Sequence, residues 1–289
     1  MNKIYKVVWN KARNCYVVGS ELMKTHQGKK SSTRSAGTLS KAAWALFWGL
    51  AGWGAACNFI YADVTVADPT HTGTVSVKDI AGSGKQYDIN NQQVSGNKAL
   101  NKFKDFNIGT NDVANMHLDG PNGNVDHQIN LVQNKMNVDG VVNAIKNNKI
   151  GGDVYFFSDK GIAISANGVF NVGRLTLGTN VHAGEVLFNG TYKVSNGGGG
   201  YKMETMDDFV KKSPAERGQL LNDLSAWGAT SIPLASIIDV AGTINASDSV
   251  VLANSEGGIQ DNWHGTGISI SKGATIQTGT GWNDFQAGQ

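Results

Sequence analysis

The sequence predicts an all-β protein in which a parallel β-helix follows a separate N-terminal segment and is interrupted by a short helical insert. The chain of 289 residues contains 37 glycines but only 4 prolines. Short β-branched runs alternate with Gly, Asn and Asp, a pattern typical of many short strands joined by tight turns. A weak internal repeat also favours stacked strands over an open sheet.

The predicted strands are short, and most of them span three to six residues. Strands of this length make a poor open sheet, but they suit a coil in which each turn stacks on the last one. The candidate strands are 73–79, 87–90, 106–109, 113–118, 128–132, 136–138, 141–145, 154–158, 161–165, 168–172, 174–177, 186–188, 192–194, 237–240, 250–253, 268–271 and 274–277.

The repeat has the form strand, Gly or Asn corner, strand. Residues 137–144 align with 238–246 when one extra residue is allowed, and similar patterns occur at 167–173 and 268–276. In a parallel β-helix the alternation points every second side chain into the interior, and Gly or Asn supplies a positive φ at the corners. The alternative, a β-sandwich, needs two-residue hairpin loops between longer strands. The pattern therefore favours the β-helix.

Residues 204–228 break the strand pattern and predict a helical insert. The glycine-rich stretch before it, 196–200, predicts a flexible tether. Two interpretations of the insert are a protruding recognition element and a helical segment packed on the flank of the coil. We favour the second, because the apolar residues of the insert form a stripe that can cover apolar surface.

Capping residues mark where the helices of the insert begin. Thr205 is expected to cap a first helix through Asp208. Ser213 and Glu216 have the spacing of a capping box, with a proline between them at the first helical position, and so predict a second helix that ends at Trp227.

The first 62 residues have the parts of a secretory signal, with an additional segment in front. A basic region precedes an apolar run, 42–57, and a cleavage site follows between Ala62 and Asp63. The run is shorter than the about 20 apolar residues that a membrane span needs, which disfavours a single anchoring helix. Lipid attachment at Cys57 is disfavoured because the usual Leu three residues earlier is missing. We therefore expect this leader to be removed.

Removing the leader changes the charge of the protein. Residues 1–62 contain 9 of the 25 Lys and Arg residues but only one of the 23 Asp and Glu residues, so residues 63–289 contain 16 basic and 22 acidic residues and carry a net charge of −6. A nucleic-acid partner would need a basic face and is therefore not expected. Both cysteines, Cys15 and Cys57, lie in the leader, so the mature domain can have no disulfide.

The first 24 residues hold a long and specific pattern. It consists of Met1-Asn2-Lys3-Ile4-Tyr5-Lys6, Trp9-Asn10, Arg13-Asn14-Cys15-Tyr16-Val17-Val18 and Ser20-Glu21-Leu22. This pattern resembles the extended signal peptide region of type V secretion in Gram-negative bacteria, which serves autotransporters and the filamentous exoproteins of two-partner secretion. The resemblance implies export through the Sec translocon and then across an outer membrane, and so a secreted or cell-surface protein.

A second pattern runs through residues 103–180. Its blocks are 101–103, 106–108, 114–118, 130–132, 136–145, 149–158, 161–164 and 168–173. In this order they resemble the secretion domain at the N-terminus of filamentous-haemagglutinin-type exoproteins. The resemblance implies a right-handed parallel β-helix with an N-terminal cap, exported through a partner outer-membrane transporter that recognises the domain. The Asn-Pro-Asn motifs of that family are absent, which leaves an autotransporter route open.

The same blocks contain the residues that we expect to serve secretion and folding. These residues are Asn130, Asn137, Gly140, Asn143, Gly151, Gly152, Gly161, Gly168, Asn171 and Gly173. A coil begins to fold as soon as its first turns leave a pore, because its contacts are local along the axis. We expect residues 151–172 to form early turns.

Residues suited to catalysis are few in the mature domain. Its histidines have no metal-ligand spacing and are expected at turns or on the surface. They are His71, His117, His127, His182 and His264. Polysaccharide-degrading β-helices need a carboxylate cluster and often a basic residue in the groove, but Arg174 and Arg217 are the only mature arginines. We expect no catalytic, cofactor or metal site and keep such an enzyme as an alternative.

The expected function is that of the N-terminal secretion domain of a large filamentous adhesin, for which the resemblance implies a host glycan or matrix protein as receptor. The other alternative is the N-terminal part of an exoprotein for contact-dependent toxin delivery. The last residues, 282–289, hold no cap for the coil, and an uncapped coil exposes its last strand as a pairing edge. We therefore expect the chain to be the front of a longer protein.

Overall fold

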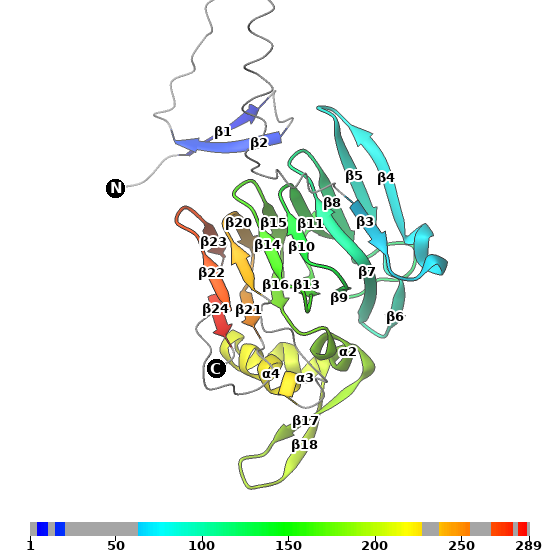
Figure 1. Cartoon of the computed structure of the whole chain (residues 1–289), viewed down its shortest axis with the longest axis vertical. Coiled ribbons are helices and arrows are strands. Elements are labelled where there is room, and N and C mark those ends of the chain that lie inside the picture. Colours follow the sequence, from blue (N-terminus) through cyan, green and yellow to red (C-terminus); the bar gives the residue numbers. More distant parts are fainter. Residues whose placement is uncertain are drawn as a thin grey trace, which may run out of the picture. The chain divides into compact units, whose positions relative to one another are not determined.

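The computed structural model describes residues 5–10, 15–20, 63–226, 237–254, 267–279 and 283–287. The chain forms two compact units, Met1–Ile60 and Tyr61–Gln289. In the first unit, β1 (Tyr5–Asn10) and β2 (Cys15–Ser20) pair as an antiparallel hairpin (Figure 1). The second unit contains all the other helices and strands that the structure describes.

Most strands of the second unit belong to three stacks of parallel strands, named stacks A, B and C (Figure 1). Stack A contains β9 (His127–Val132), β13 (Asp153–Phe157), β16 (Arg174–Gly178), β21 (Val250–Asn254) and β24 (Asn283–Ala287). Stack B contains β10 (Met136–Val138), β14 (Ile162–Ile164), β19 (Ile238–Val240) and β22 (Ile268–Ile270). Stack C contains β5 (Gly84–Ile89), β8 (Val113–His117), β11 (Val141–Lys146), β15 (Val169–Val172), β20 (Thr243–Ala246) and β23 (Thr275–Thr278).

The order of the strands shows how the chain runs through these stacks. The long strand β7 (Lys98–Ile108) begins stack A with its first half and stack B with Asn107 and Ile108. After it, the chain enters stack C and then returns to stacks A, B and C in the same order, turn after turn. Each turn therefore lies directly on the turn before it, and the stacks are extended by contacts between successive turns.

Antiparallel strands flank the first turn of the coil. β3 (Asp63–Val66) and β6 (Gln93–Ser95) pair antiparallel with β7, and β4 (Val75–Ile80) pairs antiparallel with β5. A short 3₁₀ helix, η1 (Pro69–Thr74), connects β3 to β4. Further along, β12 (Lys149–Ile150) folds back on β11.

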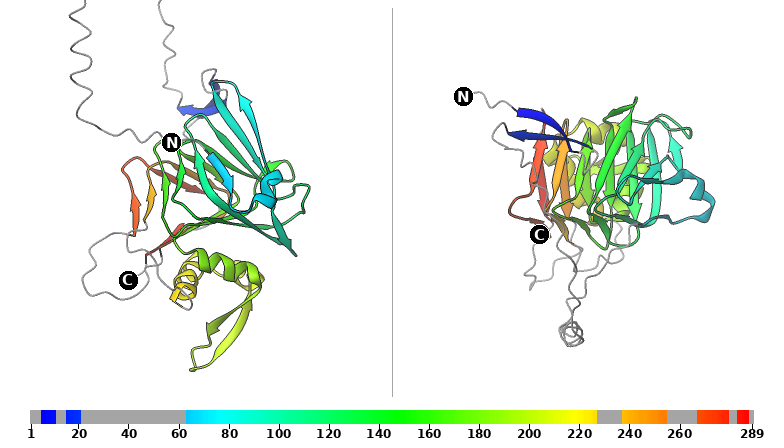
Figure 2. Two further views of the ribbon diagram at one scale, coloured as in Figure 1. Left: turned by 45° about the vertical axis from the view of Figure 1, so that its right-hand side comes forward. Right: turned by 90° about the horizontal axis from the view of Figure 1, so that it is seen from above.

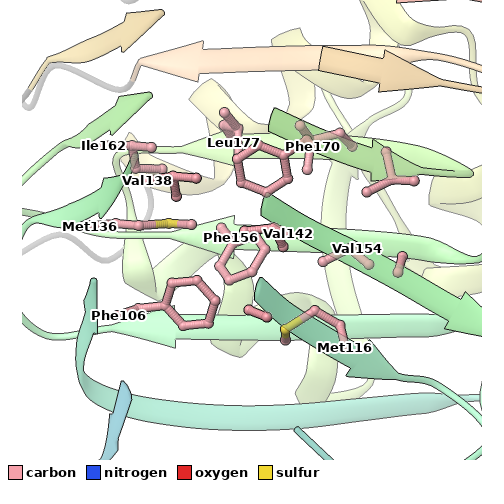
Figure 3. Close-up of a cluster of buried hydrophobic side chains, with 14 of the residues drawn as sticks. Phe106, Met116, Met136, Val138, Val142, Val154, Phe156, Ile162, Phe170 and Leu177 are labelled. Atoms are coloured by element: carbon pink, nitrogen blue, oxygen red, sulfur yellow. The ribbon is translucent and has the colours of Figure 1, made fainter. Parts of the chain in front are cut away.

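The three stacks enclose a continuous apolar core. Successive side chains of a strand point to opposite faces, and in β11 this places Val142 and Ala144 inside while Val141 and Asn143 are half-buried. Aromatic rings occupy the centre of the core. Phe156 lies with its ring centroid 5.0 Å from that of Phe106 and 6.0 Å from that of Phe170, both in edge-on contact (Figure 3).

A helical insert lies between β16 and β19. It contains α2 (Val181–Asn189), β17 (Thr191–Ser195), β18 (Tyr201–Thr205), α3 (Met206–Lys211) and α4 (Pro214–Ala226). Figures 1 and 2 show the helices beside the strands of stack A and the β17–β18 hairpin projecting beyond them.

The insert buries the outer face of stack A. Outward side chains of the stack, including Leu131 and Phe157, form a second apolar cluster with Leu187 of α2, Phe209 of α3 and Leu221 of α4. As a result, all six residues of β9 and all five of β21 are buried. The structure thus agrees with the interpretation of an insert packed on the flank of the coil.

Both predicted helix caps are confirmed. Asp208 Oδ2 accepts hydrogen bonds from the backbone N and the Oγ1 of Thr205, at 2.9 and 3.0 Å. Glu216 Oε2 accepts from the backbone N of Ser213 at 2.8 Å, and Ser213 Oγ accepts from the backbone N of Glu216 at 3.3 Å. These bonds satisfy N–H groups that lack a partner within the helix. The predicted end of the second helix, Trp227, lies outside the described residues.

Two local predictions are wrong. The strand expected at 186–188 lies in helix α2, because Asn180 caps this segment by accepting from Ala183 N at 3.1 Å and the helical period places Ala183 and Leu187 against stack A. The tether expected at 196–200 is the closed loop of the β17–β18 hairpin. There, Asn196 Oδ1 accepts from two glycine N–H groups at 3.0 Å each.

The prediction of a mostly β chain with stacked parallel strands is confirmed for the described residues. A β-sandwich would pair its strands antiparallel through hairpins, whereas the three stacks pair parallel throughout. Parallel pairing requires the chain to travel around the coil between partners. This is why the short strands alternate with corners rather than with hairpin loops.

Candidate secretion and folding region

A row of amide side chains runs along stack C and includes two of the predicted residues, Asn143 and Asn171. Asn143 Nδ2 donates to Asn115 Oδ1 at 3.1 Å, Asn171 Nδ2 donates to Asn143 Oδ1 at 2.9 Å, and Asn245 Nδ2 donates to Asn171 Oδ1 at 2.9 Å. These residues are direct register partners in adjacent strands. Every bond points in the same direction, from each turn to the turn before it.

The row begins at a carboxylate. Asp88 of β5 is the register partner of Asn115, whose Nδ2 donates to Asp88 Oδ1 at 2.9 Å. Gln86 Nε2 donates to the same carboxylate at 2.8 Å, and Lys78 Nζ lies 3.1 Å from it. We call the row formed by Asp88, Asn115, Asn143, Asn171 and Asn245 the stack C ladder.

The other two predicted asparagines also bond between turns. Asn137 Nδ2 donates to Asn107 Oδ1 at 2.8 Å in stack B. In stack A, Asn130 Oδ1 accepts from Asn101 Nδ2 at 2.9 Å, and Asn130 Nδ2 donates to the backbone O of Tyr155 at 3.1 Å. Asn130 is fully buried, and a buried amide without these partners would cost folding free energy.

Glycines stack at the corner between stacks B and C, where there is no room for a side chain. A Cβ atom on Gly140 would lie 2.2 Å from Gly109 O, and one on Gly168 would lie 2.3 Å from Val138 O. One on Gly242 would lie 2.3 Å from Gly168 O. Gly140 and Gly168 do not have a positive φ, so the expected reason for glycine at these corners is wrong. Close approach of successive turns is the reason.

The remaining predicted glycines differ among themselves. Gly152 and Gly161 have φ of +85° and +91°, the conformation that glycine adopts most readily. A Cβ on Gly173 would lie 2.6 Å from Gly152 O, so this corner is also closely packed. Gly151 has open space around its Cβ position and an ordinary φ, and the structure contains no steric reason for glycine there.

Several residues of this region were not among the predicted site residues, namely Asp88, Asn101, Asn107, Asn115, Gly242 and Asn245. One signal was present in the sequence, because Asn115, Asn143 and Asn171 follow one another at intervals of 28 residues. The predicted alignment of 137–144 with 238–246 is correct except for its extra residue. Gly140 and Asn143 occupy the same positions in their turn as Gly242 and Asn245, without an extra residue.

Charged and polar side chains form a separate cluster beneath the insert. His127 Nδ1 lies 3.0 Å from Asp153 Oδ2, and Arg174 bridges Asp153 and Asp248. Arg217 of α4 donates from Nη2 to Ser249 Oγ at 2.8 Å. Burial lowers the pKa of the Arg217 guanidinium. The cluster joins the insert to the N-terminal ends of strands in stack A.

The prediction that His127 lies at a turn or on the surface is wrong. His127 lies in strand β9, and only 7% of its side chain is exposed. Its position beneath the insert and the short distance between its Nδ1 and Asp153 Oδ2 give it a structural role. Among the described residues, no group of three His, Cys, Asp or Glu side chains is placed to hold a metal ion.

Asp88 is expected to make the free energy of unfolding depend on pH in the acidic range. Partial burial raises the pKa of this carboxyl, but hydrogen bonds from Asn115, Gln86, His117 and Lys78 hold it well below 3.8 in the folded chain. Because the pKa is lower in the folded chain, this stabilisation is present above about pH 4 and is lost as the pH falls further.

Urea unfolding at about pH 7 and pH 3 measures this effect. The loss of unfolding free energy between the two values should be smaller for Asp88→Asn than for the natural chain. Asn143→Ala is the control, because it removes a ladder residue that does not titrate and should keep the natural pH dependence. An unchanged pH dependence in Asp88→Asn would contradict the prediction.

The comparisons with known proteins concern the N-terminal part of the chain. Residues 1–50 match the family model of the Extended Signal Peptide of Type V secretion system. No curated protein matches the chain. The extended signal peptide expected from the first 24 residues is therefore confirmed. The proposed cleavage residue Ala62 lies outside the described residues, and Asp63 is the first residue of β3.

Within the described part of the chain, no helix has the length and apolar character needed to cross a membrane. The matched signal indicates Sec-dependent secretion by a type V system.

Proposed function

We propose that this chain is the non-catalytic N-terminal secretion domain of a large filamentous adhesin. In this proposal residues 1–62 are the leader that is removed, and residues 63–289 are a secretion domain of the filamentous-haemagglutinin type with a helical insert at about 204–228. The match of residues 1–50 to the extended signal peptide carries the proposal, because it defines a type V route.

The architecture supports this function. We infer that the three stacks form a right-handed parallel β-helix, because about 98% of connections between parallel strands of one sheet are right-handed. The antiparallel strands β3, β4 and β6 stand where the family resemblance places an N-terminal cap. They cover the first turn and leave later turns to stack on it.

The proposed route has two steps and two partners. The Sec translocon moves the chain across the inner membrane, and a two-partner outer-membrane transporter then recognises the secretion domain. Because each turn of the coil contacts only its neighbours, folding outside the pore can proceed turn by turn and oppose backward movement. The proposed location is the cell surface or the medium of a two-membrane bacterium, where the adhesin would contact a host glycan or matrix protein.

Export of the full chain with and without a two-partner transporter tests the route. In a two-membrane host, we expect the chain in the medium or on the surface only when the transporter is co-produced, and in the periplasm otherwise. Export that needs no transporter would contradict the two-partner route. Turnover of acidic or neutral polysaccharides by the exported protein would overturn the non-catalytic assignment.

A proline at Val169 is expected to block export after the inner membrane. Val169 N donates to Gly140 O of the previous turn at 2.8 Å, and proline removes this donor. Val169→Pro should therefore accumulate in the periplasm, whereas Val169→Ala, which keeps the N–H group, should be exported normally. The measurement is the fraction of the protein in the medium. Normal export of Val169→Pro would contradict folding-driven movement.

A further inference from the structure

Asp88 differs chemically from the other members of the stack C ladder. Its carboxylate accepts from Asn115 Nδ2 at 2.9 Å, from Gln86 Nε2 at 2.8 Å and from His117 Nε2 at 3.2 Å, and Lys78 Nζ lies 3.1 Å away. An ionised carboxylate accepts hydrogen bonds and donates none. All the groups around Asp88 are thus donors, contributed by β4, β5 and β8.

This difference determines how the asparagines are oriented. An asparagine amide has a donor end and an acceptor end, so a row of asparagines alone can be bonded in either of two directions. Because Asp88 offers only acceptor oxygens, Asn115 must turn Nδ2 toward β5 and Oδ1 toward β11. Asn143 and Asn171 then repeat this orientation, as their bonds show.

A ladder oriented in this way also selects the register of each added strand. A slip by one residue would turn the asparagine into the core and an apolar side chain outward. In β15 this would exchange the positions of Asn171 and Phe170, of which Phe170 is fully buried. In the correct register, the Oδ1 of the last asparagine in the ladder accepts a hydrogen bond from the asparagine of the added strand. This hydrogen bond therefore favours the correct register.

We propose that Asp88 is a positioning residue that sets the direction of the stack C ladder and makes its folding begin at β5 and β8 and proceed toward β20. The proposal rests on the proposed function in one respect only, namely that during export the N-terminal turns of the coil leave the pore first. The direction of folding itself is a property of the chain and can be measured without export.

Refolding and unfolding rates of the full chain test the proposal through a series of equivalent changes. Asn115→Ala, Asn171→Ala and Asn245→Ala each remove one amide at successive points of the ladder, and Asp88→Asn removes the charge at its start. Rates are followed by circular dichroism after urea dilution or urea addition. For each variant, the fraction of the lost unfolding free energy that appears as slower refolding shows how early that part of the ladder forms.

We expect Asp88→Asn to slow refolding by about tenfold and to change unfolding by less than about twofold, because hydrogen bonds to a charged group are the strongest of the ladder. Asn115→Ala should slow refolding by about fivefold. Asn245→Ala should leave refolding within about twofold and speed unfolding by about fivefold. The effect on the refolding rate should therefore decrease along the ladder from Asn115 to Asn245, and we call this decrease the gradient. If Asp88→Asn fails to fold, the three alanine variants still test the gradient.

Asp105→Asn is the matched control for the loss of a carboxylate. Asp105 Oδ1 accepts from Asn134 Nδ2 at 2.7 Å outside the ladder. The refolding rate of the Asp105→Asn variant should therefore stay within about twofold of that of the natural chain. A gradient in the opposite direction, or equal effects at all ladder positions, would overturn the proposal. So would an Asp88→Asn variant that changes the unfolding rate alone. Failure of export with the expected gradient would count against the proposed function and leave this inference intact.

Discussion

Phe156→Ala is expected to lower the free energy of unfolding by about 3–5 kcal/mol. Phe156 is fully buried at the centre of the coil, where its ring contacts those of Phe106 and Phe170. These rings come from β7, β13 and β15, so the truncation removes contacts between stacks as well as between turns (Figure 3). A cavity at this position cannot close without moving several strands, which places the cost in the upper part of the usual range.

Urea unfolding of the full chain, followed by circular dichroism, measures this loss. Val77→Ala on β4 is the control, because Val77 is 52% exposed and its truncation should cost no more than about 0.5 kcal/mol. A cost below about 1 kcal/mol for Phe156→Ala would mean that the core is not packed as the structure shows.

Gly140→Ala is expected to destabilise the chain by about 3 kcal/mol, which is the upper end of the cost of overpacking. The new Cβ would lie 2.2 Å from Gly109 O and 2.4 Å from Asp112 O. Both are backbone atoms of the preceding turn, so the strain cannot be relieved by rotating a side chain. The turns would have to separate, which would also lengthen the hydrogen bond from Val141 N to Asp112 O.

Gly151→Ala is the matched control for this change. Gly151 lies in the same predicted motif but has open space at its Cβ position and an ordinary φ. Its replacement should change the free energy of unfolding by no more than about 0.5 kcal/mol. Equal effects of the two substitutions in urea unfolding would show that the corner between stacks B and C is looser than the structure indicates.

The corner glycines show both the reach of sequence reasoning and its limit. Gly140 and Gly168 were found from the repeat, because a short strand followed by glycine recurs at both positions. The physical reason was wrong, since the backbone there does not require a positive φ. Only the distance to the preceding turn shows that a Cβ has no space, and that distance depends on how the turns stack.

The insert illustrates a second limit. Its caps at Thr205 and Ser213 involve neighbouring residues and were predicted from the sequence. Helix α2 was missed, because its apolar residues near Leu187 fit a short strand as well as a helix. Contact with the outer face of stack A decides between the two, because it favours the helical face formed by Ala183 and Leu187.

The sequence by itself determined the type V export signal, the mostly β chain and the stacking of short parallel strands. Each of these depends on patterns within a few neighbouring residues, such as basic and apolar blocks, alternation and turn residues. The tertiary structure alone decided that Asp88 begins the stack C ladder and that His127 is buried. Ladder partners are separated by 28 residues in one turn and by 74 in the turn that contains the insert. The insert breaks the 28-residue spacing, so only the folded coil shows that Asn245 bonds to Asn171.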